Sequence, residues 1–430
     1  MPLEVTVNNQ QYTTNLLQFR FFTQQNVITI LPTSGPTQGG TIVLVTFSAV
    51  APSSDSTFYC RFGEQLSVGA VVSDSEVACP SPAATNADRI LVSISTNAQQ
   101  YSNSVDYQYY HHPAVSSISP TSGPIEAGTL IDIRGVNLHD GDGYRCQFGA
   151  VNKVRTEATF EGPLPGRVLC YSAAMASPED QRFEISLNAQ QYTTDAHHFN
   201  FYATPNIYDG LSPNTGPVRG DTTIRISGVG FAGGSHYICR FAQTSDPTSR
   251  LQVPATFISP HLATCVSPLV PGDASAAYRL QLSLNGQQFS AHEEVRASFT
   301  FHGASNLEII SPNSGPVAGT TLVTISGVYL GNGSHYRCRF GEDTVNATYN
   351  EPPVDTVTCF SPVVTTGAAS PLLEVSQNGQ QFTETGLNYS FYGPALVVAV
   401  NASSAPSSVS TAAATINTSS SAASTTTSSS

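Results

Sequence analysis

Tryptophan is absent from this sequence of 430 residues, and charged side chains make up only 11% of it. Long amphipathic helices need a regular supply of charged side chains on one face, so this composition disfavours them. The 17 basic residues stand singly and the formal net charge is −13. No positive stripe is therefore present that could neutralise phosphates, and we expect neither nucleic acid nor an anionic membrane surface as a partner.

Long apolar runs are missing as well. No segment approaches the length of about 20 residues that a membrane-spanning helix needs, and the run at 395–400 is far too short. The start, Met1–Glu4, has no basic region and no apolar run of the kind found in signal peptides. We expect a membrane contact only through an anchor outside this chain.

Cysteine is scarce, but its eight residues form an even set with a repeated spacing. Paired cysteines persist as disulfides mainly in secreted and cell-surface proteins. The sequence therefore predicts an extracellular or cell-surface location, with the leader and anchor not present in this chain.

A Pro-x-x-Gly-Pro motif occurs four times, and its glycines are 88, 93 and 99 residues apart. The copies are Pro32–Pro36, Pro120–Pro124, Pro213–Pro217 and Pro312–Pro316. Each copy is followed by a Thr and then by apolar alternation, which predicts a turn leading into a strand. The period is close to the size of one immunoglobulin domain, so we predict four domains.

Each repeat also contains a Cys-x-Phe motif and then a second cysteine. The repeat symmetry assigns one disulfide to each repeat. The predicted pairs are Cys60–Cys79, Cys146–Cys170, Cys239–Cys265 and Cys338–Cys359. They differ from the usual inter-sheet bridges of immunoglobulins, which join residues much farther apart in sequence.

The last part of each repeat alternates apolar and polar residues on both sides of an Asn-led turn. The turn sequences Asn-x-Gln-Gln are at residues 97–100, 188–191, 285–288 and 378–381. Asn-Gly favours a two-residue type I′ turn because both positions need a positive φ, and Asn-Ala is a weaker version of the same signal. The sequence therefore predicts a hairpin at the end of each repeat.

Strand signals at intervals of about 8 to 12 residues imply an all-β fold of tandem immunoglobulin-like β-sandwiches. Linkers of only a few residues, such as Ala203–Pro205, favour a semi-rigid, extended rod. We place the terminal hairpin of a truncated preceding repeat at 1–25, the four repeats at 26–111, 113–203, 205–302 and 306–393, and a Ser/Thr-rich disordered stalk at 394–430.

The order of these motifs resembles the IPT/TIG domain, which occurs in plexins, in scatter-factor receptor kinases and in many surface proteins. The resemblance covers roughly residues 1–393 and implies the E-set subclass of the immunoglobulin-like fold. For disulfide-bearing extracellular members it implies roles in recognition and adhesion. Repeat 1 departs from the pattern with Phe47, where the other repeats have Gly, and repeat 2 departs with Ala173 in place of Pro.

Several residues could be taken for metal ligands, but a simpler interpretation fits each of them. Neighbouring residues on a strand point to opposite faces, so the doublets His111-His112 and His197-His198 cannot each present two ligands together. Asp140 and Asp142 lack the acidic residue that ends a calcium loop, which favours a solvated turn. We expect no metal and no cofactor.

Catalytic motifs are equally weak. The acidic residues show no repeated close pairing, and neither a Gly-x-Ser-x-Gly elbow nor a phosphate-binding glycine loop occurs. The arginines and tyrosines beside the first cysteines are expected to serve packing and surface decoration. The sequence predicts that the chain is not an enzyme.

Five N-glycosylation sequons begin at Asn332, Asn346, Asn388, Asn401 and Asn417. From Asn401 onward 18 of the 30 residues are Ser or Thr and none is charged, a composition typical of an O-glycosylated stalk. The predicted function is a cell-surface or secreted recognition and adhesion segment that binds protein or glycan partners through its loops.

Two alternative functions stay open at this point. One is a carbohydrate-binding accessory region of a larger secreted enzyme, in which the 18 Tyr would replace the missing Trp as stacking platforms. The other is a TIG dimerisation module of an intracellular transcription factor, which the paired cysteines disfavour.

Residues 1–24 resemble the terminal hairpin of the later repeats, with Asn8–Tyr12 in the place of Asn378–Phe382. A lone hairpin is at best marginally stable in water. This resemblance predicts that the chain is a fragment of a longer array of repeats.

Overall fold

The computed structural model describes residues 1–19, 21–48, 57–246, 248–271, 276–290, 295–365 and 370–394. Within these ranges the regular structure is all β, apart from one 3₁₀ turn, η1 (Val295–Ala297). The prediction of an all-β fold of tandem sandwiches is confirmed. No helix in the described residues is long and apolar enough to cross a membrane.

Repeat 1 forms a two-layer sandwich. Its strands are β3 (Val27–Leu31), β4 (Ser34–Pro36), β5 (Ile42–Phe47), β6 (Phe58–Phe62), β7 (Gln65–Ser73), β8 (Glu76–Pro80), β9 (Arg89–Ser95) and β10 (Val105–Tyr110). One sheet contains β3, β5 and β8, and the other contains β6, β9, β10 and β4. Strand β7 belongs to both sheets, because residues 65–69 pair with β6 and residues 70–73 pair with β8.

The other three repeats have the same strand order. Repeat 2 contains β11 (Ala114–Ser119), β12 (Ser122–Pro124), β13 (Leu130–Val136), β14 (Arg145–Phe148), β15 (Val154–Glu161), β16 (Arg167–Tyr171), β17 (Asp180–Ser186) and β18 (His197–Tyr202). Repeat 3 contains β19 (Asn206–Ser212), β20 (Thr215–Pro217), β21 (Thr223–Val229), β22 (Ile238–Gln243), β23 (Arg250–Ser259), β24 (Leu262–Val266), β25 (Ala276–Ser283) and β26 (Ser298–His302).

Repeat 4 contains β27 (Asn306–Ser311), β28 (Ser314–Pro316), β29 (Leu322–Val328), β30 (Arg337–Phe340), β31 (Asp343–Asn350), β32 (Thr356–Phe360), β33 (Leu372–Ser376), β34 (Leu387–Asn388) and β35 (Ser390–Tyr392). Its last strand is split into β34 and β35, which are separated by the buried Tyr389, where repeat 1 has the single strand β10. The parallel pairing of β28 with β35 still matches that of β4 with β10 in repeat 1.

Each repeat has its own hydrophobic core. Alternation along β5 buries Val43, Val45 and Phe47, and the motif Cys-x-Phe on β6 buries both Cys60 and Phe62. The positions of Val43, Val45, Cys60 and Phe62 are buried in the clusters of the other repeats as well. Each cluster consists almost entirely of one repeat, and the clusters of repeats 2 and 3 also include the last tyrosine of the preceding repeat, Tyr110 and Tyr202. The unit of folding is therefore the single repeat, as the short period of the sequence suggested.

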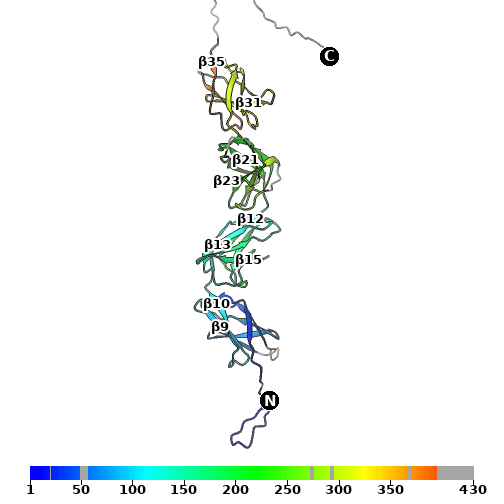
Figure 1. Ribbon diagram of the computed structural model, residues 1–430. Coiled ribbons are helices and arrows are strands. Elements are labelled where there is room, and N and C mark those ends of the chain that lie inside the picture. The colour runs from blue at the N-terminus through cyan, green and yellow to red at the C-terminus, as the bar shows by residue number, and fades with distance from the viewer. Residues whose placement is uncertain are drawn as a thin grey trace, which may run out of the picture.

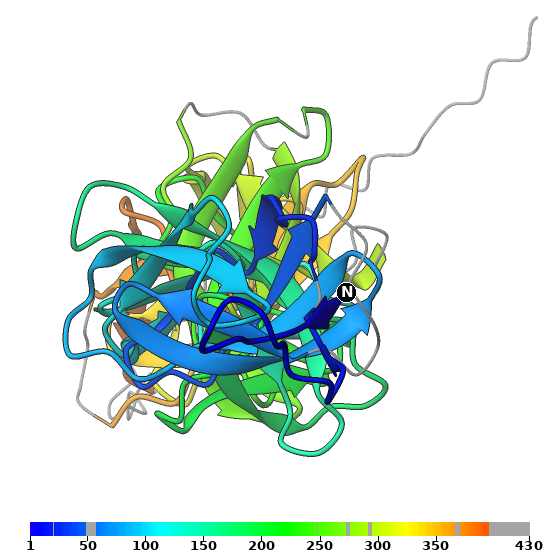
Figure 2. The ribbon, with the colours of Figure 1, turned by 90° about the horizontal axis from the view of Figure 1, so that it is seen from below.

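The four repeats follow one another in a line (Figure 1), and they project onto one another when the molecule is viewed end-on (Figure 2). The chain is thus an extended rod. Ahead of repeat 1, residues 2–18 form only a two-residue pairing between β1 (Pro2–Leu3) and β2 (Leu17–Gln18), together with a bridge between Thr6 and Tyr12.

The prediction of a type I′ turn in the terminal hairpins is wrong. Of each Asn-x pair only the second residue has a positive φ, for example 78° at Gly286 and 62° at Ala189. The reason is that the Asn side chain organises the turn: Asn285 Oδ1 accepts hydrogen bonds from the backbone N–H groups of Gln287 and Gln288, at 3.0 and 3.1 Å. This is an Asx-type turn inside a wider loop.

Candidate binding site at the joints between repeats

Adjacent repeats are connected by one contact that recurs three times along the rod. We call each of these contacts a joint and number it by its two repeats, so that joint 2–3 connects repeats 2 and 3. We call the Asn-x-Gln-Gln segments at 97–100, 188–191, 285–288 and 378–381 the docking turns. The docking turns of repeats 2, 3 and 4 each lie against the repeat that precedes them. There they meet a receiving edge, which consists of Ser34, Thr41 and Ile42 in repeat 1; Ser122, Thr129 and Leu130 in repeat 2; and Thr215, Thr222 and Thr223 in repeat 3. The corresponding residues of repeat 4 are Ser314, Thr321 and Leu322.

The first Gln of the docking turn binds main-chain atoms of the receiving edge. Gln287 Oε1 accepts a hydrogen bond from the backbone N–H of Leu130 at 2.9 Å, and its Nε2 donates to the Leu130 carbonyl at 2.8 Å. Gln190 makes the same two bonds to Ile42, and Gln380 makes them to Thr223. A primary amide therefore acts like one more strand residue at the edge of the preceding sheet.

The second Gln and the Asn bind the Thr hydroxyl of the receiving edge. In joint 2–3 the Thr129 hydroxyl donates to Gln288 Oε1 at 3.0 Å and accepts from Asn285 Nδ2 at 3.1 Å. Asn378 is 3% exposed and Thr222 is fully buried, so this group of polar atoms is shielded from water. A buried hydrogen bond removed from one side leaves its partner unsatisfied, at a cost of about 1–3 kcal/mol.

A second polar contact lies beside each docking turn. It comes from the loop that precedes the first cysteine of the following repeat. Ser235 Oγ lies 2.8 Å from Ser122 Oγ, and Ser334 Oγ lies 3.2 Å from Thr215 Oγ1. In joint 1–2 the loop residue is Asp142, which accepts hydrogen bonds from the Ser34 and Thr33 hydroxyls, both at 2.7 Å.

Asp142 lies on an exposed turn, as the sequence predicted, but the prediction missed a second role of this residue. Its carboxylate is a contact between repeats, which sequence reasoning could not see because the partners lie more than 100 positions away. Asp140, by contrast, is paired with the neighbouring His139 at 2.7 Å.

An arginine stacks on the aromatic residue that follows each docking turn. The Arg61 guanidinium carbon lies 4.1 Å from the ring centre of Tyr101, and Arg240 and Arg339 stack in the same way on Phe289 and Phe382. These arginines directly follow the first cysteine. Repeat 2 has Gln147 at this position, and Arg155 from β15 occupies the place over Tyr192. The sequence predicted only packing and surface positions for the arginines beside the first cysteines. In the structure these arginines also contact the aromatic ring next to the docking turn and thereby stabilise the turn.

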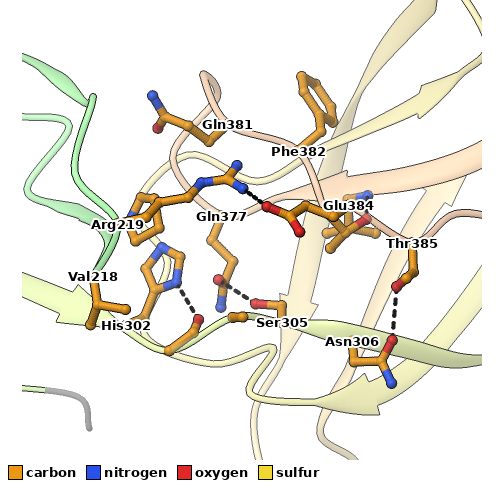
Figure 3. Close-up of a pocket in the computed structure, with 15 residues that line it drawn as sticks. Val218, Arg219, His302, Ser305, Asn306, Gln377, Gln381, Phe382, Glu384 and Thr385 are labelled. Carbon is orange, nitrogen blue, oxygen red and sulfur yellow. Dashed lines mark hydrogen bonds and ion pairs between the residues drawn. The ribbon is translucent and has the colours of Figure 1, made fainter. Parts of the chain in front are cut away.

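Joint 3–4 contains a cavity of about 230 Å³. Arg219 of repeat 3 and Glu384 of repeat 4 form an ion pair across it (Figure 3). Beneath them Gln377 Nε2 donates to the carbonyls of Tyr329 and Gly331, at 2.8 and 2.7 Å, and the Ser305 hydroxyl donates to Gln377 Oε1 at 2.7 Å. The cavity combines an ion pair, amide groups and an aromatic ring, Phe382, as a site for a small polar ligand would require.

His302 is the buried titratable group of this cavity. Its side chain is 8% exposed, Nδ1 lies 3.1 Å from the Gly303 carbonyl, and Nε2 has no hydrogen-bond partner. Burial lowers the pKa of His302, and the positive charge of Arg219 acts in the same direction, while the bond to Gly303 opposes them. The imidazole is therefore neutral at neutral pH.

Each of the four repeats matches the model of one protein family. The family model of the IPT/TIG domain matches residues 26–109, 113–200, 207–296 and 307–391, one match to each sandwich. The chain belongs to the IPT/TIG family. The resemblance seen in the sequence is thereby confirmed for four tandem domains.

Plexins are among the curated proteins that resemble this chain. Rat plexin-A3 is 24% identical over 226 residues, which are 51% of this chain and 11% of plexin-A3. Human plexin-A2 is 29% identical over 269 residues, which are 59% of this chain and 13% of plexin-A2. The matched part is thus a small fraction of these relatives.

Among solved structures, the extracellular region of plexin A4 is 14% identical, with a TM-score of 0.38, and covers 86% of this chain and 38% of that chain. The ICAM-5 D1–D4 ectodomain fragment is 11% identical, with a TM-score of 0.20, and covers 86% of this chain and all of the fragment.

Each IPT/TIG repeat contains one disulfide between its two sheets. The structure joins Cys60 to Cys79, Cys146 to Cys170, Cys239 to Cys265 and Cys338 to Cys359, with Cα–Cα distances of 6.0, 6.5, 6.5 and 6.4 Å. The loop between the cysteines is short because the intervening strand, β7 in repeat 1, crosses from one sheet to the other. The bridges therefore do connect two sheets, although they join residues close in sequence.

Most of the other predicted site residues lie apart from the joints, although Asn332 belongs to the loop whose Ser334 contacts Thr215. The sequons at Asn332, Asn346 and Asn388 have exposed asparagines, whereas Asn401 and Asn417 lie outside the described residues, as does the predicted stalk from 395 onward. His197 Nε2 lies 2.9 Å from the Val115 carbonyl and His198 Nδ1 lies 2.8 Å from Asp180, so this doublet does point in two directions. No group of three or more potential metal ligands occurs in the described ranges.

Sequence reasoning missed the functional role of the docking turns. It identified Asn-x-Gln-Gln as a turn but assigned nothing to the two glutamines. A signal was present, because both glutamines recur unchanged in all four repeats, while the residue between Asn and Gln is Ala in repeats 1 and 2 and Gly in repeats 3 and 4.

Proposed function

We propose that this chain is the recognition segment of a cell-surface or secreted protein, in which a stiff rod of four IPT/TIG repeats presents its loops to protein or glycan partners. The observation that carries the proposal is the recurrence of one polar joint between all four repeats. A joint with about six hydrogen bonds holds its two repeats at a fixed angle, so that loops far apart in sequence keep a constant spacing.

Two further findings support this function. Plexins, the relatives named above, share IPT/TIG sequence over about half of this chain. The four cysteine pairs favour an extracellular location, where disulfides persist. We further propose that the segment has no catalytic turnover of its own, since the two oppositely charged side chains of the joint 3–4 cavity, Arg219 and Glu384, form an ion pair with each other.

Within the rod, we propose that a chemical group of the binding partner occupies the cavity of joint 3–4. Arg219 and Glu384 are 44% and 79% exposed at their side chains, so a ligand can reach both. Phe382 offers a ring face beside them, although Arg339 already lies over that ring, 4.3 Å from its centre. A polar group with neighbouring apolar surface, such as a peptide side chain or a sugar ring, fits this combination.

The proposal is tested by binding of the purified chain to arrays of extracellular proteins and of glycans. We expect saturable binding to a small number of ligands. The variants Arg219→Ala and Glu384→Ala should weaken that binding if it uses joint 3–4, while Arg89→Ala, which removes an exposed ion pair with Asp106 on repeat 1, serves as a matched control.

A second measurement concerns location. Surface labelling of intact cells that express the natural full-length protein should modify this segment. A protein found only in the nucleus, together with the absence of any ligand on either array, would contradict the proposed function.

A further inference from the structure

Repeat 4 has an open groove of about 1060 Å³ beside the loop that reaches repeat 3. Val328, Tyr329 and Pro352 give the groove apolar and aromatic surface. Glu351 and Asp355 add two exposed carboxylates. Because the loop beside it already contacts repeat 3, the groove is open with this neighbour of the rod in place.

Asn332 lines this groove and begins a sequon, Asn-Gly-Ser. Its side chain is exposed, and its φ of 65° lies in the left-handed region, which Asn adopts more readily than most residues. The Tyr336 hydroxyl fixes the loop on both sides of Asn332, because it accepts from the Gly333 N–H and donates to the Leu330 carbonyl, both at 2.8 Å. A sugar attached to Asn332 would therefore begin inside the groove, on a fixed backbone.

Two stacked tyrosine rings support the same loop. The ring centres of Tyr336 and Tyr349 are 5.4 Å apart, and their planes differ by 10°. A Cβ atom at Gly331 would lie 2.9 Å from the Tyr349 hydroxyl, so the backbone passes directly over this residue. The Tyr349 hydroxyl in turn donates to Asp355 Oδ1 at 2.7 Å, which orients one carboxylate of the groove.

Repeat 3 differs in both features. Gly233 stands in the place of Asn332, so its loop has no sequon. The connection at 260–261, which corresponds to 351–355 in repeat 4, bonds back to the sandwich. The Pro260 carbonyl accepts from the Phe231 N–H at 3.2 Å, and His261 Nδ1 lies 3.1 Å from the Gly228 carbonyl. The sequon and the wider connection thus occur together in repeat 4.

We propose that this groove holds the first sugars of an N-linked glycan on Asn332. The proposal rests on the extracellular location proposed above, because N-glycosylation takes place in the secretory pathway. In the transfer, Asn332 Nδ2 loses a proton and bonds to the anomeric carbon of the first sugar, and the lipid diphosphate that carried the oligosaccharide departs. The Tyr329 ring, on a side chain that is 67% exposed, stacks on the apolar face of a sugar, while Glu351 and Asp355 accept hydrogen bonds from its hydroxyl groups.

The covalent attachment favours this occupant over a free sugar. A glycan on Asn332 meets the groove within the same molecule, at an effective concentration on the order of 1 mM, so that even weak stacking fills the groove. The groove also borders joint 3–4, because the carbonyls of Tyr329 and Gly331 accept hydrogen bonds from Gln377. A glycan held there would therefore also steady the wall of that joint.

Asn346 provides an internal control on the same repeat. It begins an exposed sequon on β31, whose alternate residues Val345, Ala347 and Tyr349 pack against the core. The Asn346 side chain consequently points to the opposite face of the strand. A glycan on Asn346 should extend into solvent.

The test is the release of glycans by a peptide-N-glycosidase from the folded full chain, secreted by animal cells and followed at each asparagine by mass spectrometry. We expect the glycan of Asn332 to be released at least about fivefold faster from Tyr329→Ala than from the natural chain, because the variant loses the stacking ring. The rate at Asn346 should be the same in both. The Tyr329 side chain is mostly exposed, so this variant keeps its fold. The matched control is Tyr392→Ala, which removes a ring outside the groove that is 52% exposed and should change neither rate.

The location and the groove are separated by mapping glycopeptides of the natural full-length protein. A protein without glycans at Asn332, Asn346 and Asn388 would contradict the extracellular location, and the groove proposal with it. Glycans at Asn346 and Asn388 with none at Asn332 would overturn the groove proposal alone. So would a release rate at Asn332 that Tyr329→Ala leaves unchanged.

Discussion

At the scale of single residues, a tyrosine two positions before the first cysteine fixes the loop that reaches the preceding repeat. The Tyr237 hydroxyl donates to the Phe231 carbonyl at 2.7 Å and accepts from the Gly234 N–H at 3.1 Å. Tyr144 and Tyr336 make the same pair of bonds in repeats 2 and 4. Repeat 1 has Phe58 at this position, which cannot make them.

We expect Tyr237→Phe to lower the free energy of unfolding of repeat 3 by about 1–3 kcal/mol, since two backbone groups lose their partner while the ring stays. Chemical denaturation, followed by a probe in repeat 3, measures the change. Tyr208→Phe is the matched control, because Tyr208 is 45% exposed and should change stability by less than about 0.5 kcal/mol. Equal effects of the two substitutions would show that the hydroxyl bonds contribute nothing.

Because His302 is buried beside joint 3–4, we predict that the folded structure around this joint loses stability in acid. Its pKa is lowered by burial, so the unfolded chain binds a proton at a higher pH than the folded one does. Stability is therefore lost as the pH falls through about 6.5, the ordinary pKa of histidine. Unfolding of the natural chain between pH 7 and pH 5 should show a larger loss of stability than that of His302→Gln.

The control for this measurement is a substitution of the exposed His111. His111→Gln should keep the pH dependence of the natural sequence. Identical pH profiles for the natural chain and His302→Gln would contradict the assignment.

At the scale of elements, the docking turn acts on the joint and not on the sandwich that carries it. Gln287→Ala/Gln288→Ala removes four hydrogen bonds to Leu130, Thr129 and Gly128. We expect joint 2–3 to become flexible, which small-angle scattering detects as a shorter average rod, while the thermal unfolding of both repeats stays nearly unchanged. The same pair of substitutions at Gln99 and Gln100 removes no contact to a neighbouring repeat and should leave the scattering of the monomer unaltered.

The disulfide links the two sheets of a repeat, so its removal should destabilise that repeat alone. For Cys239→Ala/Cys265→Ala we expect a loss of about 3 kcal/mol, the value for a loop of this size in the chain-entropy model. Denaturant unfolding should show a lowered transition for repeat 3 and unchanged transitions for the others, since each repeat has its own core. Peptide mapping without reduction tests all four pairs, and a bridge between repeats or a free thiol would contradict them.

The strands illustrate how far sequence patterns reach. Alternation predicted segments such as β5 and β29, and the recurring cysteines predicted which segments lie together, because both signals are local or repeated. The geometry of the terminal turn was predicted wrongly. There the Asn side chain competes with the backbone for the hydrogen bonds of the turn, and propensities for φ do not include that competition.

At the scale of the whole molecule, the joints of the rod are held mainly by amide and hydroxyl groups within the described residues, with the Asp142 carboxylate added at joint 1–2 and an ion pair at joint 3–4. We predict that its length does not depend on calcium. Small-angle scattering with excess EDTA and with millimolar Ca²⁺ should give the same maximum dimension, because no described joint contains three potential metal ligands. A longer rod with Ca²⁺ would indicate ligands at joint 1–2, where Asp142 lies.

The sequence by itself determined the number of repeats, the all-β fold, the pairing predicted for the cysteines and the family resemblance. Each of these follows from hydrophobic alternation, turn residues or internal repetition, which are properties of short segments compared with one another. The joints were decided only by the tertiary structure. Gln190 meets Ile42 across 148 positions and Asp142 meets Ser34 across 108, and the buried His302 lines a cavity to which both repeat 3 and repeat 4 contribute. Such contacts depend on where two separately folded sandwiches are placed, and no pattern within a single repeat contains that distance.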